Sequence, residues 1–572
     1  MERIWLKRYP PGVPADIRHD EYPSVAALFE ASAREHASRP AYHCMGRTIT
    51  FAELDKLARD FAAWLQSRGV KKGDRVAIML PNVLQYPVAL FGALRAGATV
   101  VNVNPLYTAR ELEHQLKDSG AETIVILENF ANVLQSCLGQ TPVKNIAVAS
   151  LGEMLGFKGS IVNFVVRHVK KMVPEFALPH AVRFDEALED GAKRELKPVR
   201  TGLEDIAFLQ YTGGTTGVSK GAMLLHRNIL ANLEQVAAWQ KPFLGDQLAE
   251  QVIITALPLY HIFSLTANCL AFMKFGGCNV LITNPKDIPG FVKELGRHKF
   301  NVITGVNTLF NALLNHPDFA KLDFSNLRFA FGGGMAVQRA VAERWQQVTG
   351  VALLEGYGLT ETAPVATTNP LDLKEYSGSI GLPVSSTELR FRAENGRWLP
   401  VWDGKRPVEE CTGEIGIRGP QVMAGYWQRP EETAKVMTED GFFMTGDIGY
   451  MDKEGFAYIV DRKKDMVLVS GFNVYPNEVE GVIAMHPGVL EVAVIGIPDA
   501  HSGEVVKAYI VKKDPTLGEK DVLAHCEKHL TGYKRPKHVE FRTELPKTNV
   551  GKILRRALRD EAVGATAGRK AA

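Results

Sequence analysis

The sequence has little cysteine and almost no surplus charge. Its 572 residues include six cysteines with no CxxC pair, which excludes a disulfide scaffold and a zinc ribbon and favours reduced thiols. The net charge of +3 is too small to suggest nucleic acid as a partner. The 46% hydrophobic and 23% charged residues exclude disordered, collagen-like and long coiled-coil classes. A chain of this length exceeds the ~250–300 residues of one growing core, so we expect at least two domains.

Targeting and membrane-spanning signals are also lacking. No apolar run of signal-peptide length stands near Met1, and no prenylation or peroxisomal tripeptide closes the sequence. The 23 residues between Glu250 and Lys274 carry no charged side chain and are long enough to span a bilayer. Because polar residues and Pro258 lie through their middle, a buried strand, loop and helix are expected instead. We therefore expect a cytoplasmic protein.

Helical and strand patterns alternate along the chain. Ser24 is a plausible N-cap for a helix through Ala37, and apolar residues recur at helical spacing over 51–68 and 84–96. Continuous apolar strands between helices favour parallel sheets covered by helices. We expect an α/β fold: a large N-terminal domain of parallel, helix-covered sheets with sub-domains, followed by a small mobile α+β domain. The expected strands are 75–80, 98–103, 122–127, 206–209, 279–283, 301–304, 351–354 and 456–460.

A domain boundary is indicated by five consecutive charged residues at 461–465, directly after an expected strand. Such a run is usually a solvated turn, and the few Gly, Pro and Ser residues around it favour a hinge over a long linker. We expect an N-terminal domain over 1–460, a hinge at 461–464 and a C-terminal lid domain over 465–572.

Residues 157–173 combine apolar residues on one helical face with side chains of positive charge only. A basic amphipathic helix can lie on an anionic membrane surface, for instance the cytoplasmic face of an inner membrane. The alternative is a surface helix packed on its own domain, and the sequence leaves both open.

The most specific segment is the glycine- and hydroxyl-rich run YTGGTTGVSKG at 211–221, between an apolar strand and a helical run. Glycines let backbone N–H groups approach anionic oxygens, and hydroxyls and a lysine add donors and charge. The run is not a Walker A loop, because the residues around Lys220 do not have that spacing. A polyphosphate ligand is expected here. The candidate contacts are Thr212, Gly213, Gly214, Thr215, Thr216, Gly217 and Lys220.

This loop resembles the signature of the adenylate-forming superfamily, which includes acyl-CoA synthetases, luciferases and peptide-synthetase adenylation domains. The segments PNVLQYP (81–87) and GFNVYPNE (471–478) closely resemble bacterial long-chain fatty-acid–CoA ligases, and the resemblance covers essentially the whole chain. The other signatures follow in order: LPLYH (257–261), GGG (332–334), YGLTET (357–362), TGD (445–447), DRKKD (461–465) and PKTNVGK (546–552).

The resemblance implies a ligase that works in two steps. A fatty carboxylate attacks the α-phosphate of ATP, which gives an acyl-adenylate and pyrophosphate, and the thiol of coenzyme A then displaces AMP. The first step joins two anions and needs concentrated positive charge from Mg²⁺ and lysine. Fatty acid, ATP, Mg²⁺ and coenzyme A are thus the expected small-molecule partners.

Residue roles follow from the same resemblance. Glu361 is expected to bind Mg²⁺ together with Thr215, and Thr360 beside it is expected at the reacting centre and the nucleotide. Tyr357 would stack on adenine, and Asp447 would accept hydrogen bonds from the ribose with Arg462 beside it. The remaining nucleotide contacts expected in these motifs are Gly333, Gly334, Glu355, Gly356 and Gly358.

Lys552 is the expected catalytic lysine, bridging the carboxylate and the α-phosphate. The small domain of the superfamily rotates between the two steps, and Lys464 maps onto its pivot. Rotation would withdraw Lys552 and bring Gly471 to the coenzyme A channel, where glycine suits a backbone passing close to pantetheine. Some relatives have a lysine four residues after the pivot, but Leu468 stands there, so no role is transferred to it.

The residues directly after His261 narrow the choice of acid. Amino-acid-activating relatives place an aspartate shortly after this region, whereas residues 261–265 hold no carboxylate. Only 20 residues follow Lys552, so a diffusible acceptor, coenzyme A, is expected.

His261 itself either lines the acyl entrance as a catalytic residue or is a core histidine bonded to the backbone. A medium-chain or aryl ligase, or a membrane-associated fatty-acid binding or uptake protein, are the alternatives. Chain length, a homo-oligomeric state and the coenzyme A nucleotide contacts stay open.

Overall fold

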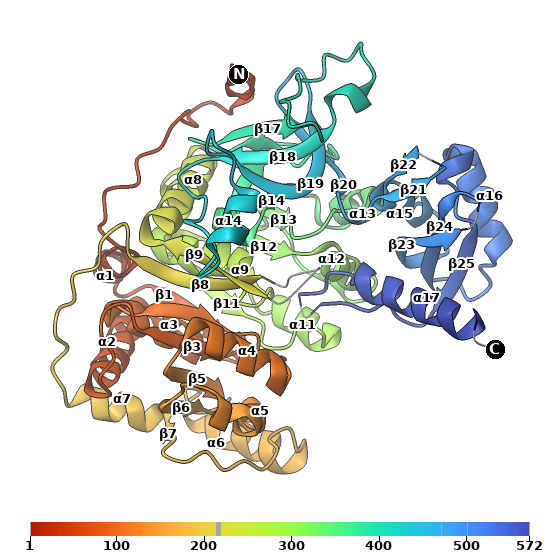
Figure 1. Ribbon diagram of the computed structural model, residues 1–572. Helices are drawn as coiled ribbons and strands as arrows, with labels where there is room; N and C mark the ends of the chain where they lie inside the picture. Colours follow the sequence, from red (N-terminus) through yellow and green to blue (C-terminus); the bar gives the residue numbers. More distant parts are fainter. Residues whose placement is uncertain (1, 213–218, 471, 500, 549, 571–572) are drawn as a thin grey trace.

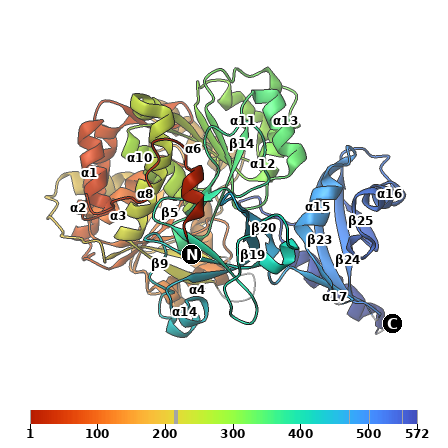
Figure 2. The same cartoon turned by 90° about the horizontal axis from the view of Figure 1, so that it is seen from above.

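The computed structural model describes residues 2–212, 219–470, 472–499, 501–548 and 550–570, which form four β-sheets with helices packed around them. Figures 1 and 2 show the C-terminal residues, in blue, as a separate body beside the rest of the chain. The expected α/β class, with a large N-terminal and a smaller C-terminal domain, is confirmed. Within the described part of the chain, no helix is both long and apolar enough to cross a bilayer.

A seven-stranded sheet forms the first layer, in the order β7-β6-β5-β3-β4-β8-β9. Its neighbours pair in parallel except β8 and β9, which form an antiparallel hairpin around the glycine-rich loop. Alternate residues of β3 face opposite cores: Val76 and Ile78 belong to one, Ala77 and Met79 to the other. The strands are β3 (Arg75–Met79), β4 (Thr99–Asn102), β5 (Thr123–Leu127), β6 (Asn145–Ala149), β7 (Val182–Arg183), β8 (Ile206–Thr212) and β9 (Lys220–Leu225).

A nine-stranded sheet forms the second layer, in the order β16-β15-β14-β13-β12-β10-β11-β1-β2. It is parallel from β14 to β1 and antiparallel at both ends. The uncharged stretch supplies β10 and then the helical segment α9 (Ile262–Ser264), η6 (Leu265–Leu270) and α10 (Ala271–Phe275), as predicted. The strands are β1 (Pro40–Cys44), β2 (Arg47–Thr50), β10 (Val252–Thr255), β11 (Cys278–Leu281), β12 (Val302–Gly305), β13 (Phe329–Gly332), β14 (Leu353–Gly358), β15 (Val365–Thr368) and β16 (Leu382–Pro383).

The helices begin where local capping predicts. Ser24 caps α1 (Val25–Glu35) by accepting a hydrogen bond from the N–H of Ala27, and Thr50 forms a capping box with Glu53 at the start of α2 (Phe51–Ser67). The other helices of the large domain are α3 (Gln85–Arg95), α4 (Ala109–Ser119), α5 (Ala131–Cys137), α6 (Phe157–Phe164), α7 (Phe184–Ala192), α8 (His226–Leu244), α11 (Ile288–Leu295), α12 (Asn307–Leu314), α13 (Arg339–Thr349) and α14 (Pro430–Val436), with the π-helical turn η4 (Val165–Val169) after α6.

An antiparallel four-stranded sheet precedes the small domain, and the sequence predicted only its last strand, at 456–460. Its order is β17-β18-β19-β20. The strands are β17 (Glu388–Arg392), β18 (Gly413–Arg418), β19 (Phe443–Met451) and β20 (Ala457–Arg462). The predicted hinge therefore begins inside β20 and continues into the turn after it.

The C-terminal sheet has the order β22-β21-β24-β23, with β25 paired to β24. Its strands are β21 (Val467–Val469), β22 (Phe472–Val474), β23 (Val489–Asp499), β24 (Gly503–Lys512) and β25 (His538–Arg542), and α15 (Pro476–Ala484), α16 (Glu519–His529) and α17 (Arg555–Lys570) pack on it. The charged run is not simply solvated: Asp461 and Asp465 are buried. Their partner, Arg555, lies about 90 residues away in the sequence, with ion pairs of 3.1 and 3.4 Å.

Candidate active site

A cavity of about 2020 Å³ lies between the large and the small domain. Its lining includes the ends of β8, β13, β14 and β19 and the loop before α17. Among the described residues, all but one of the predicted site residues line it: Thr212, Lys220, His261, Gly333, Gly334, Glu355, Gly356, Tyr357, Gly358, Thr360, Glu361, Asp447, Arg462 and Lys552. The exception is Lys464, which stands exposed on the turn after β20. Gly213, Gly214, Thr215, Thr216, Gly217 and Gly471 lie outside the described residues.

The start of β9 brings one cation to the cavity. The ammonium of Lys220 forms an ion pair with Glu432 of α14 and lies 5.1 Å from the ring centroid of Tyr426. Lys220 pairs with Thr212 across the antiparallel strands β8 and β9, and both residues line the cavity.

Glu361 is a buried carboxylate directed into the same region. Its Oε1 accepts a 2.7 Å hydrogen bond from the hydroxyl of Tyr426, and 8% of the residue is exposed. Burial raises the pKa of Glu361. A buried carboxylate that lines a cavity fits a hard dication, because Mg²⁺ is commonly held by one or two carboxylates together with phosphate oxygens.

Three side chains form a connected group at the end of β14. The Tyr357 hydroxyl donates a 2.7 Å hydrogen bond to Oδ2 of Asp447, and Arg462 forms a 3.1 Å ion pair with its Oδ1. Asp447 is only 4% exposed, so these contacts fix the carboxylate in one orientation. Burial, with the neighbouring Asp447 charge, raises the pKa of Tyr357, which stays a donor.

Backbone geometry explains the glycines of these motifs. Gly334 has φ of +76°, a conformation that favours glycine. A Cβ on Gly358 would stand 1.8 Å from the carbonyl oxygen of Pro364, so no larger residue fits. Glu355 supports the loop after β13, since its Oε1 accepts a 3.0 Å hydrogen bond from the N–H of Val337, and burial raises its pKa to about 7.

His261 has features of both predicted roles. Its Nδ1 accepts a 3.3 Å hydrogen bond from the N–H of Phe263 at the start of α9, and the half-buried ring also lines the cavity. Burial, with the positive charge of Lys552, lowers the pKa of His261 to about 4. The ring is therefore neutral at pH 7 and near Lys552.

The small domain brings Lys552 to the cavity. Lys552 is half-buried, and burial together with the charge of Arg462 lowers its pKa to about 8. Its loop is held to the large domain by a 2.9 Å hydrogen bond from the Thr308 hydroxyl to the carbonyl of Gly551. Asn311 of α12 makes a second such bond, 2.9 Å long, to the carbonyl of Leu490.

Sequence reasoning missed Tyr426 and Arg555. Tyr426 holds Glu361 from 65 residues away. Arg555 forms ion pairs with Glu480, Asp461 and Asp465, which tie α17 and α15 to the turn after β20. No local pattern marks either residue, because each partner comes from a distant part of the chain.

Two family models match the chain. The model described as AMP-binding enzyme matches residues 29–427, and the AMP-binding enzyme C-terminal domain matches residues 478–552. A long-chain-fatty-acid–CoA ligase of Escherichia coli O6:H1 is 56% identical over 566 residues, 99% of each chain. One of Yersinia pestis is 57% identical over 565 residues, 98% of this chain and 99% of the relative.

The solved structure of the anthranilate CoA ligase AuaEII in complex with anthranoyl-AMP superposes with a TM-score of 0.84 at 26% identity. It covers 96% of this chain and 100% of that one. The family models span most of the chain, and the relatives match it from end to end. The predicted resemblance is thus confirmed, and the chain belongs to the AMP-binding enzymes of the adenylate-forming superfamily.

Proposed function

We propose that this chain is a long-chain fatty-acid–CoA ligase. It activates a fatty acid with ATP to an acyl-adenylate and pyrophosphate, and then transfers the acyl group to the thiol of coenzyme A with release of AMP. The observation that carries the proposal is one cavity that holds Lys552, the Tyr357–Asp447–Arg462 group and Glu361 together. The Escherichia coli and Yersinia pestis relatives, more than half identical, carry this activity in their names.

The large domain binds the nucleotide in this proposal. Asp447 accepts hydrogen bonds from the ribose while Arg462 keeps its carboxylate oriented, and Tyr357 faces the adenine. Lys220 and the loop before it hold the β- and γ-phosphates, and Glu361 holds Mg²⁺ with Tyr426 fixing its orientation. Bound by Glu361, Mg²⁺ would supply positive charge that neutralises the phosphates.

Lys552 supplies the charge that brings the two anions together. With a pKa of about 8 its ammonium is largely protonated at pH 7, and it lies in the cavity between the domains. From there it contacts the attacking carboxylate and the α-phosphate, and it stabilises the charge that grows between them in the transition state.

The second step requires a different arrangement of the small domain. While Lys552 is in the cavity, its loop stands beside Val306 and Thr308 of the large domain. We propose that the small domain turns about residues 461–464, withdraws Lys552 and presents the loop around Phe472 to coenzyme A. Lys464, exposed on that turn, is placed to accommodate the rotation.

Apolar side chains from α8, β10, α10 and β12 also line the cavity. They are Val236, Trp239, Ile253, Phe272 and Val302. Each buried methylene contributes about 0.8 kcal/mol, so an apolar lining of this kind favours a long acyl chain over a short or polar acid.

Pyrophosphate release tests the proposal directly. The protein is supplied with ATP, Mg²⁺ and saturated acids from short to long chains, with and without coenzyme A. We expect release to be greatest with long chains and to turn over only with coenzyme A. A maximum with short or aromatic acids would contradict the assignment of a long-chain substrate. No release with any acid would contradict the proposed enzymatic activity and favour a binding role.

We also propose that α6 and the residues after it bind an anionic lipid surface. One face of this segment is fixed to the domain: a Cβ on Gly159 would stand 1.9 Å from the carbonyl of Gly152, and Arg167 forms a 2.8 Å ion pair with Glu128. The other face carries large apolar side chains that are 54–102% exposed, together with exposed lysines. The apolar residues are Phe157, Ile161, Phe164, Val169 and Met172; the lysines are Lys158, Lys170 and Lys171.

Such a surface binds lipid through apolar insertion and attraction to anionic headgroups. We expect the protein to sediment with vesicles that contain phosphatidylglycerol and much less with pure phosphatidylcholine. Replacing Phe157, Ile161 and Phe164 by serine should abolish sedimentation, whereas Leu468→Ser, which removes an exposed leucine of the small domain, should not. Equal sedimentation of both variants would contradict the proposal.

A further inference from the structure

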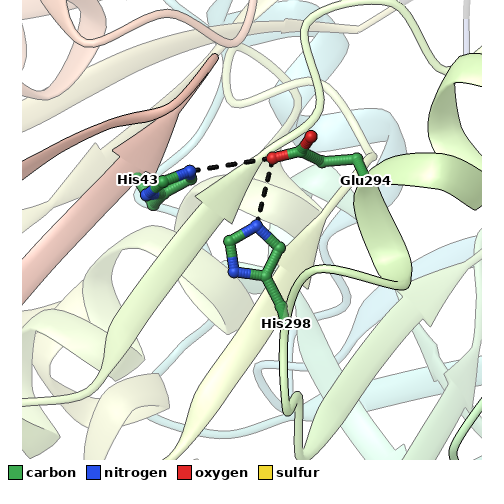
Figure 3. A group of neighbouring side chains, drawn as sticks. All are labelled: His43, Glu294 and His298. Carbon is green, nitrogen blue, oxygen red and sulfur yellow. Dashed lines mark hydrogen bonds and ion pairs between the residues drawn. The ribbon is translucent and has the colours of Figure 1, made fainter.

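Three side chains outside the active-site cavity converge on one point between β1 and α11 (Figure 3). Oε1 of Glu294 lies 3.1 Å from Nε2 of His298 and 3.7 Å from Nε2 of His43. The three candidate ligand atoms all lie within 4.8 Å of one another, and none of the three residues lines the large cavity.

These distances resemble those in a coordination shell. Zinc bonds to histidine nitrogen and carboxylate oxygen are about 2.0–2.2 Å, so two ligands of a tetrahedral ion stand roughly 3.3–3.5 Å apart. The measured 3.1 and 3.7 Å bracket that separation. The planes of the His43 and His298 rings meet at 68°, with centroids 4.7 Å apart.

The backbone brings the ligands from two rigid elements. His43 lies near the end of β1, in register with Val280 of β11 and Thr48 of β2. Glu294 is in the last turn of α11, and His298 follows in a turn closed by a hydrogen bond from its N–H to the carbonyl of Leu295. The site thus joins segments about 250 residues apart in the sequence.

Neighbouring groups orient the ligands. Nδ1 of His43 is 2.7 Å from the Thr48 hydroxyl, which leaves Nε2 directed at Glu294. Arg297 donates a 2.6 Å hydrogen bond to Oε2 of Glu294 and leaves Oε1 to the imidazoles. The Arg297 side chain is 56% exposed, so its charge is screened by water and can move away from a bound cation.

The ligand groups stay open to solvent. The ligand side chains are each 17–18% exposed, which leaves access for an ion and its water ligand.

We infer that His43, Glu294 and His298 form a binding site for a divalent transition-metal ion of the zinc type, separate from the magnesium used with ATP. Two imidazoles and one carboxylate prefer zinc, cobalt or nickel, whereas magnesium prefers oxygen ligands alone. Three protein ligands leave the fourth position of a tetrahedral ion to water. The bound ion links the β1–β2 hairpin to α11 and stabilises the edge of the nine-stranded sheet.

The test is titration of the metal-stripped full-length protein with Zn²⁺ in the presence of Mg²⁺, followed by calorimetry. The double variant His43→Asn/His298→Gln removes both imidazoles. The matched control is His525→Gln/His529→Gln, which removes a histidine pair on α16 whose ring centroids are 4.8 Å apart. We expect the wild type and the control to bind one ion per chain at this site.

Loss of a partner to a metal ligand typically costs 10–100-fold in affinity, so loss of both imidazoles should cost more than about 100-fold. Thr48→Val should show the smaller loss of ~10–100-fold, with the absorption of bound Co²⁺ retained at higher metal concentration. Zn²⁺ should raise the Tm of the wild type and the control but not that of His43→Asn/His298→Gln.

Equal zinc affinity in the wild type and in His43→Asn/His298→Gln would overturn the inference, as would loss of binding only in the α16 control. If His43→Asn/His298→Gln does not fold, the Zn²⁺ titration of Thr48→Val tests the site instead. A zinc affinity unchanged from the wild type would contradict the site. A wild type that binds no Zn²⁺ would contradict it outright.

Discussion

The two walls of the active-site cavity are stabilised in different ways. The wall from the large domain is held by contacts among its own side chains, from Tyr357 and Arg462 to Asp447 and from Tyr426 to Glu361. The wall from the small domain carries Lys552 and contacts the large domain through hydrogen bonds such as that of Thr308 to Gly551. Since a hydrogen bond contributes about 0.5–1.5 kcal/mol net, the second wall can leave at low cost, whereas the first is ready before substrate arrives.

The small domain is nevertheless firm within itself. Arg555 is 13% exposed and forms ion pairs with Glu480 and Asp465, so the loop bearing Lys552 is attached to a rigid body. A third ion pair joins Arg555 to Asp461 at the end of β20 and connects this body to the hinge. The comparison teaches that a catalytic group can be positioned accurately and still be withdrawn as a unit.

Removal of the Lys552 ammonium should have the largest effect. Loss of one group that stabilises transition-state charge costs about 10²–10³-fold in rate, and Lys552→Ala should slow adenylate formation by at least this factor. The variant should still convert supplied acyl-adenylate and coenzyme A to thioester at close to the wild-type rate. Pyrophosphate release and thioester formation are measured separately, and an equal loss in both steps would contradict the division of labour.

Asp447→Asn tests the preformed wall. Hydrogen bonds to charged groups contribute about 1.5–3 kcal/mol, so ATP should bind about 10–100-fold more weakly. Because the ribose stays bound in both steps, use of supplied acyl-adenylate should weaken as well. An effect confined to adenylate formation would mean that Asp447 acts in the first step only, as Lys552 does, and would contradict its role in the preformed nucleotide site.

Tyr426→Phe removes the hydroxyl that orients Glu361 while the ring remains. The loss of one hydrogen bond of about 0.5–1.5 kcal/mol should raise the Mg²⁺ concentration needed for half-maximal adenylation by up to about tenfold. Titration with Mg²⁺ at saturating ATP measures this. An unchanged magnesium requirement would argue against Glu361 as its ligand.

Thr308→Val should weaken the contact between the walls. A loss near 1 kcal/mol lowers the population of the arrangement with Lys552 in the cavity, so adenylation should slow by up to about fivefold. The step with coenzyme A should be unchanged or faster. A slowing of both steps would mean that the contact supports the fold rather than one arrangement.

The smallest effect concerns pH. Because the pKa of Lys552 is lowered to about 8, its charge is present below that value and is lost as pH rises through it. Adenylate formation should therefore fall about twofold near pH 8 and further above it. In Lys552→Arg the guanidinium stays charged, so whatever activity remains should not fall in this range. A wild-type rate that is flat across pH 8 would contradict the role of the ammonium.

Part of the fold and most of the described site residues were predictable from local sequence and from motifs. Ser24 marks a helix start and the apolar run at 75–80 marks a buried strand, because capping and burial are local properties. The predicted site residues that the structure describes, from Thr212 to Lys552, share one cavity with the exception of Lys464.

The rest depends on contacts between distant residues. The sequence around Asp461 and Asp465 predicts a solvated turn, and only Arg555, about 90 residues later, makes their burial favourable. Tyr426 likewise acquires a role only when the fold brings it to Glu361. In the antiparallel sheet of β17–β20 only β20 was predicted, because the other three strands lack the long apolar runs that mark a buried parallel sheet.

A disulfide between the walls would test the central claim most directly. A Cβ on Gly551 would stand 2.9 Å from the Thr308 hydroxyl, so Thr308→Cys with Gly551→Cys brings two thiols together whose oxidation would hold Lys552 in the cavity. Because Gly551 has φ of +84°, the single variant Gly551→Cys serves to measure the backbone strain of that substitution. The account predicts that the oxidised protein forms acyl-adenylate and pyrophosphate but no acyl-CoA, and that dithiothreitol restores acyl-CoA formation. The two single variants, which cannot form the disulfide, should form acyl-CoA with or without dithiothreitol. If the oxidised protein formed acyl-CoA as fast as the dithiothreitol-treated protein, the account would be contradicted.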